Sequence, residues 1–275
     1  GTAPGYVALG KWMLTEGKTV YAKWIVNTYM LTFDSNGGSP ETGITVEYGD
    51  FLTLPMPTRA NYTFNGWYES ETGNNGSGTQ FNAATMPDLG DNGTTKILYA
   101  KWTAKTAIEY TPAVQSHTYG TASAAYTVSY PSLTGFTVEY YVGSAWTAMP
   151  PTGARSYDIR ITRAEDTIYA SYASGTLDDH FVINPATLTV TVKPGVIITK
   201  AYDEDAAVDG VQSDWLIVNG LKNGETATAV GTWSYANADA GTGKPVNITE
   251  ISIAYGTANS ANYSYTPASL STTGD

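Results

Sequence analysis

The chain has 275 residues, of which only 14% are charged, and it carries a formal net charge of −11. This acidic balance argues against nucleic acid and anionic membranes as partners, because both are bound through clustered Lys and Arg. The absence of Cys excludes disulfides and cysteine-ligated metal sites. No apolar run is long enough for a membrane-spanning helix, so we expect no direct membrane insertion by this fragment.

Short runs rich in Val, Ile, Thr and Tyr alternate with turn residues along the chain, which predicts a mainly β fold with little helix. The clearest pattern is residues 187–192, in which Leu188, Val190 and Val192 share one face. Six Asn-Gly pairs predict tight hairpin turns, since both residues tolerate positive φ. One short helix is predicted, at residues 80–88. The other predicted strands are 29–33, 44–48, 136–141, 157–162 and 246–253, and the Asn-Gly pairs begin at Asn36, Asn65, Asn75, Asn92, Asn219 and Asn223.

The string YAKW occurs twice, at residues 21–24 and 99–102, and each copy closes a similar segment. We interpret it as the last strand of a repeated unit. Residues 1–24 are then the C-terminal tail of a truncated preceding repeat, and residues 25–104 are a complete unit. A tail without its first strands cannot close its own sheet, so we expect it to be mobile or to borrow packing from the next unit.

The first complete unit carries a recognisable series of motifs, namely FDSNGG, a YG before an apolar run, YTFNGWY and LYAKW. This string resembles the Listeria–Bacteroides repeat, also known as the B-repeat of internalin B, although one loop is longer here. The resemblance implies a β-grasp-like fold, with a sheet wrapped on a short helix, and tandem occurrence on bacterial surface proteins. The signature residues that match are Phe33, Gly37, Gly38, Tyr62, Phe64, Gly66, Trp67, Tyr99 and Trp102.

Two further units are predicted, at residues 105–184 and 185–275, because a proline after Asn184 restricts that residue to extended geometry. The first contains TYG and FVINPATL and resembles the MBG-type modules of bacterial adhesins, with Arg155–Ser156 in place of the usual Gly-Thr. The second contains KAYDEDAAVDG and NSANYSYTP and resembles the YDG-type repeat of secreted adhesins, with Asp203–Glu204 in place of Asp-Gly. Either unit could be β-grasp-like or β-sandwich-like. Short links between the units predict an elongated tandem array.

Aromatic residues raise the possibility of glycan binding. Trp12, Trp146 and Trp233 lie in loop-rich surroundings and are candidates for stacking against a sugar ring. The alternative is that they pack in a core, which is the interpretation we prefer for the signature residues Trp67 and Trp102. The exposure of these side chains separates the two alternatives.

The run YDEDAAVDG is the densest group of carboxylates, and oxygen-rich clusters of this kind suit Ca²⁺. The spacing of a calcium-binding EF-hand loop is absent, so a solvated turn is the preferred interpretation and we expect no metal and no cofactor. Residues 177–180, with the sequence LDDH, are a weaker metal candidate because no second His is near. The carboxylates of the acidic run are Asp203, Glu204, Asp205 and Asp209.

No nucleophile motif or phosphate-binding loop is present; the GTGK at residues 241–244 lacks the upstream glycine. The leading hypothesis is therefore a non-catalytic, monomeric stalk or adhesion segment of a bacterial cell-surface protein. It would contact neighbouring repeats of the same chain and a host protein or glycan. The alternatives are a carbohydrate-binding module that uses exposed Trp and Tyr, and part of a polysaccharide-processing enzyme with paired carboxylates. A Lys–Asn isopeptide cross-link also stays open.

Overall fold

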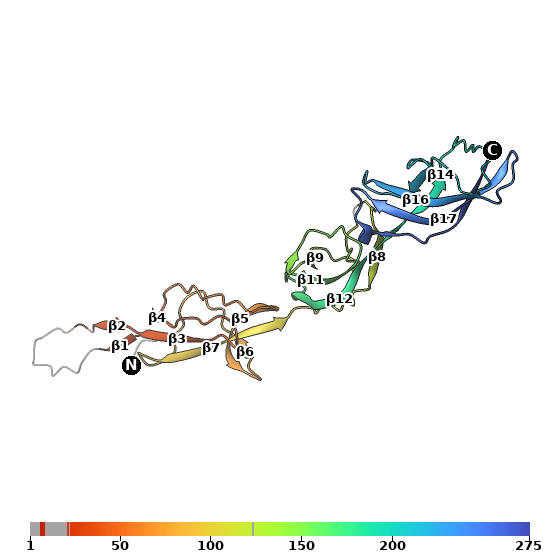
Figure 1. Ribbon diagram of the computed structural model, residues 1–275. Helices are drawn as coiled ribbons and strands as arrows, with labels where there is room; N and C mark the ends of the chain where they lie inside the picture. Colours follow the sequence, from red (N-terminus) through yellow and green to blue (C-terminus); the bar gives the residue numbers. More distant parts are fainter. Residues whose placement is uncertain (1–5, 9–20, 22, 123) are drawn as a thin grey trace, which may run out of the picture. The chain divides into compact units, whose positions relative to one another are not determined.

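The computed structural model describes residues 6–8, 21, 23–122 and 124–275. In this part of the chain the elements are strands arranged in six small sheets, with one 3₁₀ turn, η1 (Ser260–Asn262). The prediction of a mainly β fold with little helix is confirmed. The chain divides into two compact units, the first formed by residues 1–109 and 163–172 and the second by residues 110–162 and 173–275 (Figure 1).

A mixed five-stranded sheet forms the centre of the first unit. Its strands lie in the order β4-β3-β7-β5-β6, with β3 and β7 parallel and the other neighbours antiparallel. A separate antiparallel pair, β1 with β2, precedes it. The strands are β1 (Tyr6–Ala8), β2 (Trp24–Val26), β3 (Thr28–Asp34), β4 (Ile44–Glu47), β5 (Tyr62–Glu71), β6 (Gly76–Gln80) and β7 (Thr95–Ala104).

One face of this sheet is the core of the repeat. In β7 the side chains of Leu98, Ala100 and Trp102 are buried, whereas Ile97 on the other face is 49% exposed. Successive residues of a strand point to opposite faces, so the alternation written in ILYAKW follows from strand geometry. The core is completed from β3, β5 and the segment before β7 by Tyr29, Leu31, Trp67, Phe81 and Met86.

The helix predicted at residues 80–88 is wrong, because the segment after β6 is irregular and bends at Ala84. Phe81 and Met86 are both buried in the core, and in a helix two side chains five positions apart point about 140° away from each other. The bend lets both side chains reach the core, and Thr85 forms a bridge with Phe51, so the main chain pairs with residues 49–52. The hydrogen bonds are Gly49 N to Met86 O at 2.9 Å, Leu52 N to Ala84 O at 3.0 Å and Met86 N to Asp50 O at 2.7 Å. The helix that a β-grasp-like unit requires is therefore absent from the described part of this repeat.

The second unit begins with another mixed five-stranded sheet, in the order β10-β9-β11-β12-β8. As in the first sheet, the first and last strands in sequence lie side by side and run parallel, here β8 with β12. Tyr140, Ile159, Ile161 and Phe181 fill its buried face. The strands are β8 (Gln115–Thr118), β9 (Thr137–Val142), β10 (Ala145–Thr147), β11 (Ser156–Arg163) and β12 (Tyr172–Asn184).

The C-terminal part of the second unit has small sheets around one core. The pair β14-β15 and the antiparallel sheet β16-β17-β19 both contribute buried side chains, among them Val190, Leu216, Trp233 and Ile248. Two sheets that share one core correspond to the sandwich-like alternative. The strands are β13 (Ala186–Thr187), which pairs with β18 (Tyr263–Ser264), and β14 (Thr189–Val192), β15 (Leu216–Asn219), β16 (Ala227–Tyr235), β17 (Lys244–Tyr255) and β19 (Leu270–Gly274).

No helix among the described residues is long and apolar enough to cross a membrane. The predicted tail at residues 1–24 lies mostly outside the described residues, and its strand β1 pairs with β2 at the start of the next predicted unit. The units 1–24, 25–104, 105–184 and 185–275 stay our proposal for the domain organisation. We call residues 25–104, 105–184 and 185–275 the first, middle and last modules.

Candidate functional site

The motif YTFNGWY contains a β-bulge rather than a turn. Phe64 pairs with Trp102 and Trp67 with Ala100, so three steps along β5 match two along β7. The Asn-Gly pair 65–66 takes up the extra residue, and its glycine has a φ of +108° that other residues rarely adopt. The bulge places Phe64 and Trp67 on the same face, with ring centroids 5.5 Å apart. The hairpin turn predicted at this pair is therefore wrong.

The motif FDSNGG packs against the second YAKW. The indole N–H of Trp102 donates to the Ser35 carbonyl at 2.9 Å, and a Cβ on Gly38 would lie 2.5 Å from the Trp102 ring. The side chain of Asn75 accepts from the Trp102 main-chain N–H at 2.7 Å and donates to its carbonyl at 3.1 Å. Trp102 is 4% exposed, so these motifs hold an aromatic side chain inside the repeat.

The remaining signature residues have structural positions in the same repeat. Phe33, Tyr62 and Phe64 are partly buried against the core, and the Phe33 ring lies 4.8 Å from that of Trp67, which is 2% exposed. Gly37 occupies a turn with a φ of +83°. Tyr99 is half-buried on the other face of β7. The signature residues therefore occupy packing and turn positions in the repeat.

Two of the three tryptophans proposed for glycan binding can be assessed. Trp233 is 4% exposed and packs edge-on against Trp215, with centroids 5.4 Å apart, so it offers no face to a sugar. Trp146 is half-buried on β10, where it contacts Tyr141 at 5.3 Å and the Arg160 guanidinium at 4.7 Å. Trp12 lies outside the described residues.

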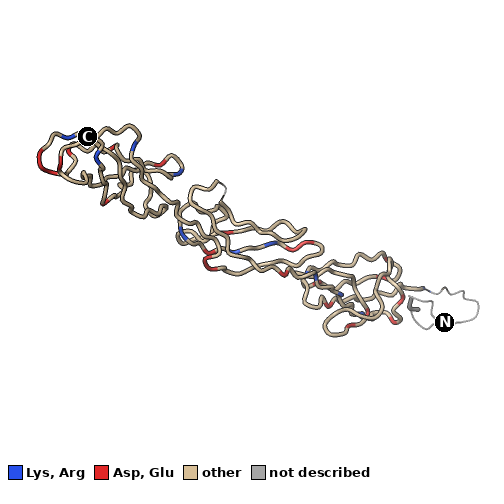
Figure 2. The backbone as a smooth tube through the Cα atoms, turned by 90° about the vertical axis from the view of Figure 1, so that its right-hand side faces the viewer, with Lys and Arg blue, Asp and Glu red and all other residues tan. Residues whose placement is uncertain are grey.

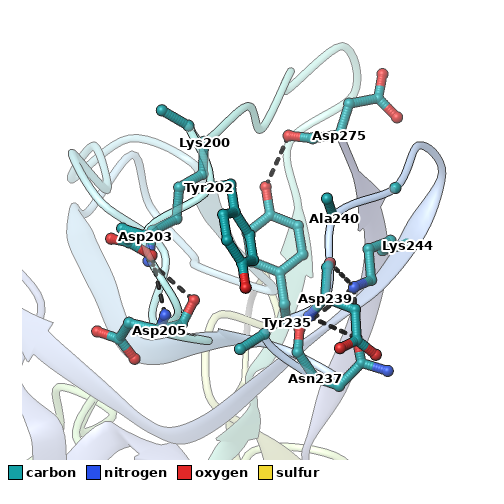
Figure 3. Close-up of a pocket in the computed structure, with 13 residues that line it drawn as sticks. Lys200, Tyr202, Asp203, Asp205, Tyr235, Asn237, Asp239, Ala240, Lys244 and Asp275 are labelled. Carbon is teal, nitrogen blue, oxygen red and sulfur yellow. Dashed lines mark hydrogen bonds and ion pairs between the residues drawn. The ribbon is translucent and has the colours of Figure 1, made fainter.

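The acidic run is arranged around a lysine. Lys200 Nζ lies 2.9 Å from a carboxylate oxygen of Asp203 and donates to the Asp205 carbonyl at 3.1 Å; Figure 3 labels these three residues. It also donates to the Ala207 carbonyl at 2.8 Å, while Asp209 lies farther away at 4.0 Å. The ammonium lowers the pKa of Asp203. An internal cation therefore takes the place that the sequence suggested for Ca²⁺.

The remaining weak candidates do not form a site either. Glu204 only supplies a residue of positive φ in the same loop. In LDDH, the ring nitrogen Nδ1 of His180 lies 2.8 Å from the Asp178 carbonyl, and the Asp179 N–H donates to Asp158 at 3.0 Å. Among the described residues no group of three or more His, Asp or Glu side chains is placed to hold a metal ion.

Figure 3 shows a small hollow beside Lys200. It is lined by Tyr202, Tyr235 and Asp275, and its volume of about 100 Å³ is far below the roughly 300 Å³ of a small-molecule site. At its rim Lys244 Nζ contacts the Asn237 side-chain oxygen. This is a Lys–Asn contact of the kind a cross-link requires, but both residues lie at the solvent-accessible rim, and the cross-link stays an open prediction.

A stronger functional candidate is the segment from the end of β11 to the start of β12, residues 163–172, which we call the docking loop. It belongs to the same compact unit as the first module, although it lies within the predicted middle module. Thr106 forms a parallel bridge with Tyr169: its N–H donates to the Ile168 carbonyl and its carbonyl accepts from Ala170 N–H, both at 2.8 Å. The docking loop thus continues the main-chain pairing at the end of β7.

Side chains reinforce this contact. Glu165 accepts from the Asn61 main-chain N–H at 2.7 Å and from Lys105 Nζ at 2.8 Å. The Asn61 side-chain oxygen accepts from both the N–H and the hydroxyl of Ser171, at 2.7 and 2.8 Å. Asn61 has a φ of +63°, a conformation that Asn tolerates better than most residues. Lys105 lowers the pKa of Glu165.

The docking loop also has its own internal order. Asp166 accepts from the main-chain N–H groups of Ile168 and Tyr169, both at 2.7 Å, and forms an ion pair with Arg163. These donors, the Tyr169 N–H first, lower the pKa of Asp166 to about 2. Sequence reasoning missed this loop. The available signal was Asp166, because an Asp often accepts from the main-chain N–H groups two and three residues after it in a turn.

Comparison with known proteins supports the assignment of two modules. Residues 29–101 match the family model of the Listeria-Bacteroides repeat domain, and residues 184–271 match that of the YDG domain. A protein of Evansella cellulosilytica provisionally named a membrane protein is 38% identical over 90 residues, which cover 32% of this chain and 12% of the relative. Internalin H of Listeria monocytogenes is 38% identical over 92 residues, which cover 33% of this chain and 15% of internalin H.

The matched part therefore spans less than a sixth of the length of these relatives, and no solved structure matches the chain significantly. The resemblance of residues 105–184 to MBG-type modules stays a prediction. The two family matches, the bulge of YTFNGWY and the packing of FDSNGG on Trp102 lead to one conclusion: this chain contains a Listeria–Bacteroides repeat followed by a YDG domain.

Proposed function

We propose that the chain is a non-catalytic spacer segment of a bacterial cell-surface protein, which holds a binding domain away from the cell. The observation that carries this proposal is the docking loop, because its Glu165 and Ser171 hydrogen-bond to Asn61 inside the first compact unit, so that this unit extends beyond the first module. Small β modules with specific nearest-neighbour contacts form a semi-rigid array. The similarity to internalin H and to a protein provisionally named a membrane protein supports a surface location.

The electrostatics favour a spacer over a polysaccharide-processing enzyme. Glycoside cleavage requires one carboxyl group whose pKa is raised, so that it can act as an acid. Five carboxylates of the described residues have a clearly lowered pKa, because Lys, Arg or main-chain N–H groups donate to them. These carboxylates are Glu139, Glu165, Asp166, Asp203 and Asp214.

A second candidate function is weak glycan contact by the middle module. Tyr141, which is 40% exposed, and Trp146 lie side by side on the outer face of β9 and β10, and the nearby Arg160 pairs with Glu139 at 2.7 Å. Aromatic rings beside a charged hydrogen-bonding pair suit the apolar face and the hydroxyls of a sugar. A glycan array probed with the chain and with Trp146→Ala would test this. Signals that are absent, or equal for both proteins, would exclude it.

Two measurements test the spacer proposal. In small-angle scattering, we expect a radius of gyration well above the about 19 Å of a single compact domain of this length. Protease treatment of intact cells that express the parent protein should release fragments from this region. A compact scattering profile, or a region that proteases reach only after lysis, would contradict the proposal.

A further inference from the structure

The second unit contains a half-buried carboxylate held by two buried tyrosines. The hydroxyl of Tyr119, directly after β8, donates to one oxygen of Glu225 at 2.7 Å, and the hydroxyl of Tyr263 at the start of β18 donates to the other. Tyr119 lies in the middle module, whereas Glu225 and Tyr263 lie within the region that matches the YDG domain. The two tyrosine rings contact each other edge-on, with centroids 5.4 Å apart. We call these three residues the tyrosine clasp.

The surroundings of the clasp fix its side chains. Both tyrosines are 6% exposed, and the Tyr263 hydroxyl also accepts from the Lys222 main-chain N–H at 2.8 Å. The main-chain N–H of Tyr119 donates to the Asn184 carbonyl at the end of β12, at 2.8 Å. Tyr119 is thus hydrogen-bonded to the middle module and Tyr263 to the last module, and both donate to Glu225.

A second contact of the same kind lies in the same unit. The side-chain oxygen of Asn262, a residue only 9% exposed within η1, accepts from the Ala154 main-chain N–H at 2.8 Å. On the other side, Gly120 has a φ of +79° and passes so close to Lys222 that a Cβ would lie 2.5 Å from its side chain. The contact between these modules thus combines charge, buried amide and close packing.

The chemistry of the clasp makes it directional. A carboxylate that accepts from two phenol groups forms charge-assisted hydrogen bonds, which are stronger than neutral ones. Both tyrosine donors are buried, so a rotated arrangement of the modules would leave their hydroxyls without an acceptor. Each carboxylate oxygen has its own tyrosine, which selects one orientation.

We propose that the tyrosine clasp is the interaction surface by which the YDG domain fits the module before it, and that it locks the two modules in a single orientation. This inference deepens the spacer proposal and rests on it for its biological purpose. The partner surface is defined chemically by Tyr119 after a parallel edge strand, the Ala154 N–H and a glycine that admits Lys222.

The inference can be tested by distance measurements between spin labels. The chain has no native Cys, so cysteines at the exposed positions Ala145 and Ser252, one in each module, would be labelled uniquely. We expect a narrow distance distribution for the parent chain. Glu225→Gln and Tyr119→Phe should each lose the narrow distribution while circular dichroism stays unchanged. Tyr235→Phe is the matched control, because it removes a buried tyrosine hydroxyl that donates to Asp275 in the same domain but outside the clasp.

A broad distribution in the parent chain, or a narrow one that persists in both clasp variants, would overturn the inference. Equal broadening by Tyr235→Phe would also overturn it, since the effect would then come from general loosening of the domain. If Glu225→Gln does not fold, the milder Tyr119→Phe decides the question alone, because its hydroxyl contacts only side chains of the last module. Failure here leaves the scattering and protease results of the spacer proposal unaffected, so the two can be judged separately.

Discussion

The docking loop and the tyrosine clasp each hold a glutamate, but the donors differ: a lysine in the docking loop and two tyrosines in the clasp. In the docking loop, Glu165 is 37% exposed at its side chain and pairs with the ammonium of Lys105 at 2.8 Å. In the clasp, Glu225 accepts from two tyrosines that are each 6% exposed. The tyrosine donors of the clasp are therefore more enclosed than Glu165, while Glu225 itself is half-buried.

This difference predicts unequal stiffness. Exposed ion pairs contribute little, because solvent and salt screen them and two flexible side chains must be ordered. The hydrogen bonds of the clasp are charge-assisted and have buried tyrosine donors, so breaking one leaves a buried hydroxyl without a partner. We therefore expect the hydrogen bonds of the docking loop to open more readily than those of the tyrosine clasp.

The largest effect is expected for Tyr263→Phe. The change deprives Glu225 of a donor and the Lys222 N–H of its acceptor, so unfolding of the YDG domain should become easier by about 2 kcal/mol. Urea denaturation followed by tryptophan fluorescence measures this. Tyr235→Phe, which removes one neutral bond to Asp275, should cost about 1 kcal/mol. Equal losses for the two variants would show that the clasp is no stronger than an ordinary buried tyrosine.

Alkaline pH should weaken the clasp next. Burial, followed by the Glu225 hydrogen bond, raises the pKa of Tyr263 to about 12 and also raises that of Tyr119. Since the folded pKa lies above the usual value of about 10, the stabilisation is complete below that pH and is lost as the pH rises toward about 12. Denaturation midpoints across this range should fall more steeply for the parent chain than for Tyr263→Phe. Parallel curves would contradict the raised pKa.

A smaller, salt-dependent effect is expected at the docking loop. Glu165→Gln removes the charge that Lys105 Nζ and the Asn61 N–H face, so hydrogen exchange at the Thr106 and Ala170 amides should accelerate. Raising the salt concentration should accelerate exchange in the parent chain toward the level of the variant. Exchange at the Lys222 amide of the clasp should respond much less. A salt response of equal size at both places would remove the proposed distinction.

The smallest effect is expected for the internal order of the docking loop in acid. The N–H groups of Tyr169 and Ile168, together with Arg163, lower the pKa of Asp166 to about 2. A folded pKa below the usual value of about 4 means that the stabilisation is present above pH ~4 and is lost as the pH falls toward ~2. Amide exchange at Ile168 should follow this window. Asp166→Asn is the control, and a pH response that survives in it would assign the titration elsewhere.

The mainly β fold and two of the module families could be predicted from the sequence because local patterns encode them. Alternating residues such as Leu98, Ala100 and Trp102 determine one buried face of a strand, and the motif strings identify two module families. The non-helical conformation of residues 80–88 could not be predicted in this way, because it depends on main-chain hydrogen bonds with residues 49–52. Likewise, the Asn-Gly pair at 65–66 suits a turn locally, and only its partners on β7 make it a bulge.

The candidate sites show the same limit. Carboxylates such as Asp203 are visible in the sequence as a possible Ca²⁺ site, but the position of Lys200 among them is a tertiary fact. The tyrosine clasp joins residues 106 positions apart in sequence, Tyr119 and Glu225; Tyr119 stands in the motif TYG, but no local pattern marks Glu225 as its partner. Contacts between distant segments are set by the summed packing of both modules, which a strand pattern does not contain.

The two copies of YAKW separate what the sequence determines from what tertiary contacts decide. The sequence alone predicts that each copy is the strand-like end of a repeat, and the structure confirms the strand, β7, for the second copy. In the structure Trp102 is 4% exposed, whereas Trp24 is 40% exposed. The reason is tertiary: the ring of Trp102 is enclosed by the FDSNGG loop and Phe64, with Asn75 bonded to its main chain, while Trp24 lies in the two-stranded β1-β2 pair outside that core.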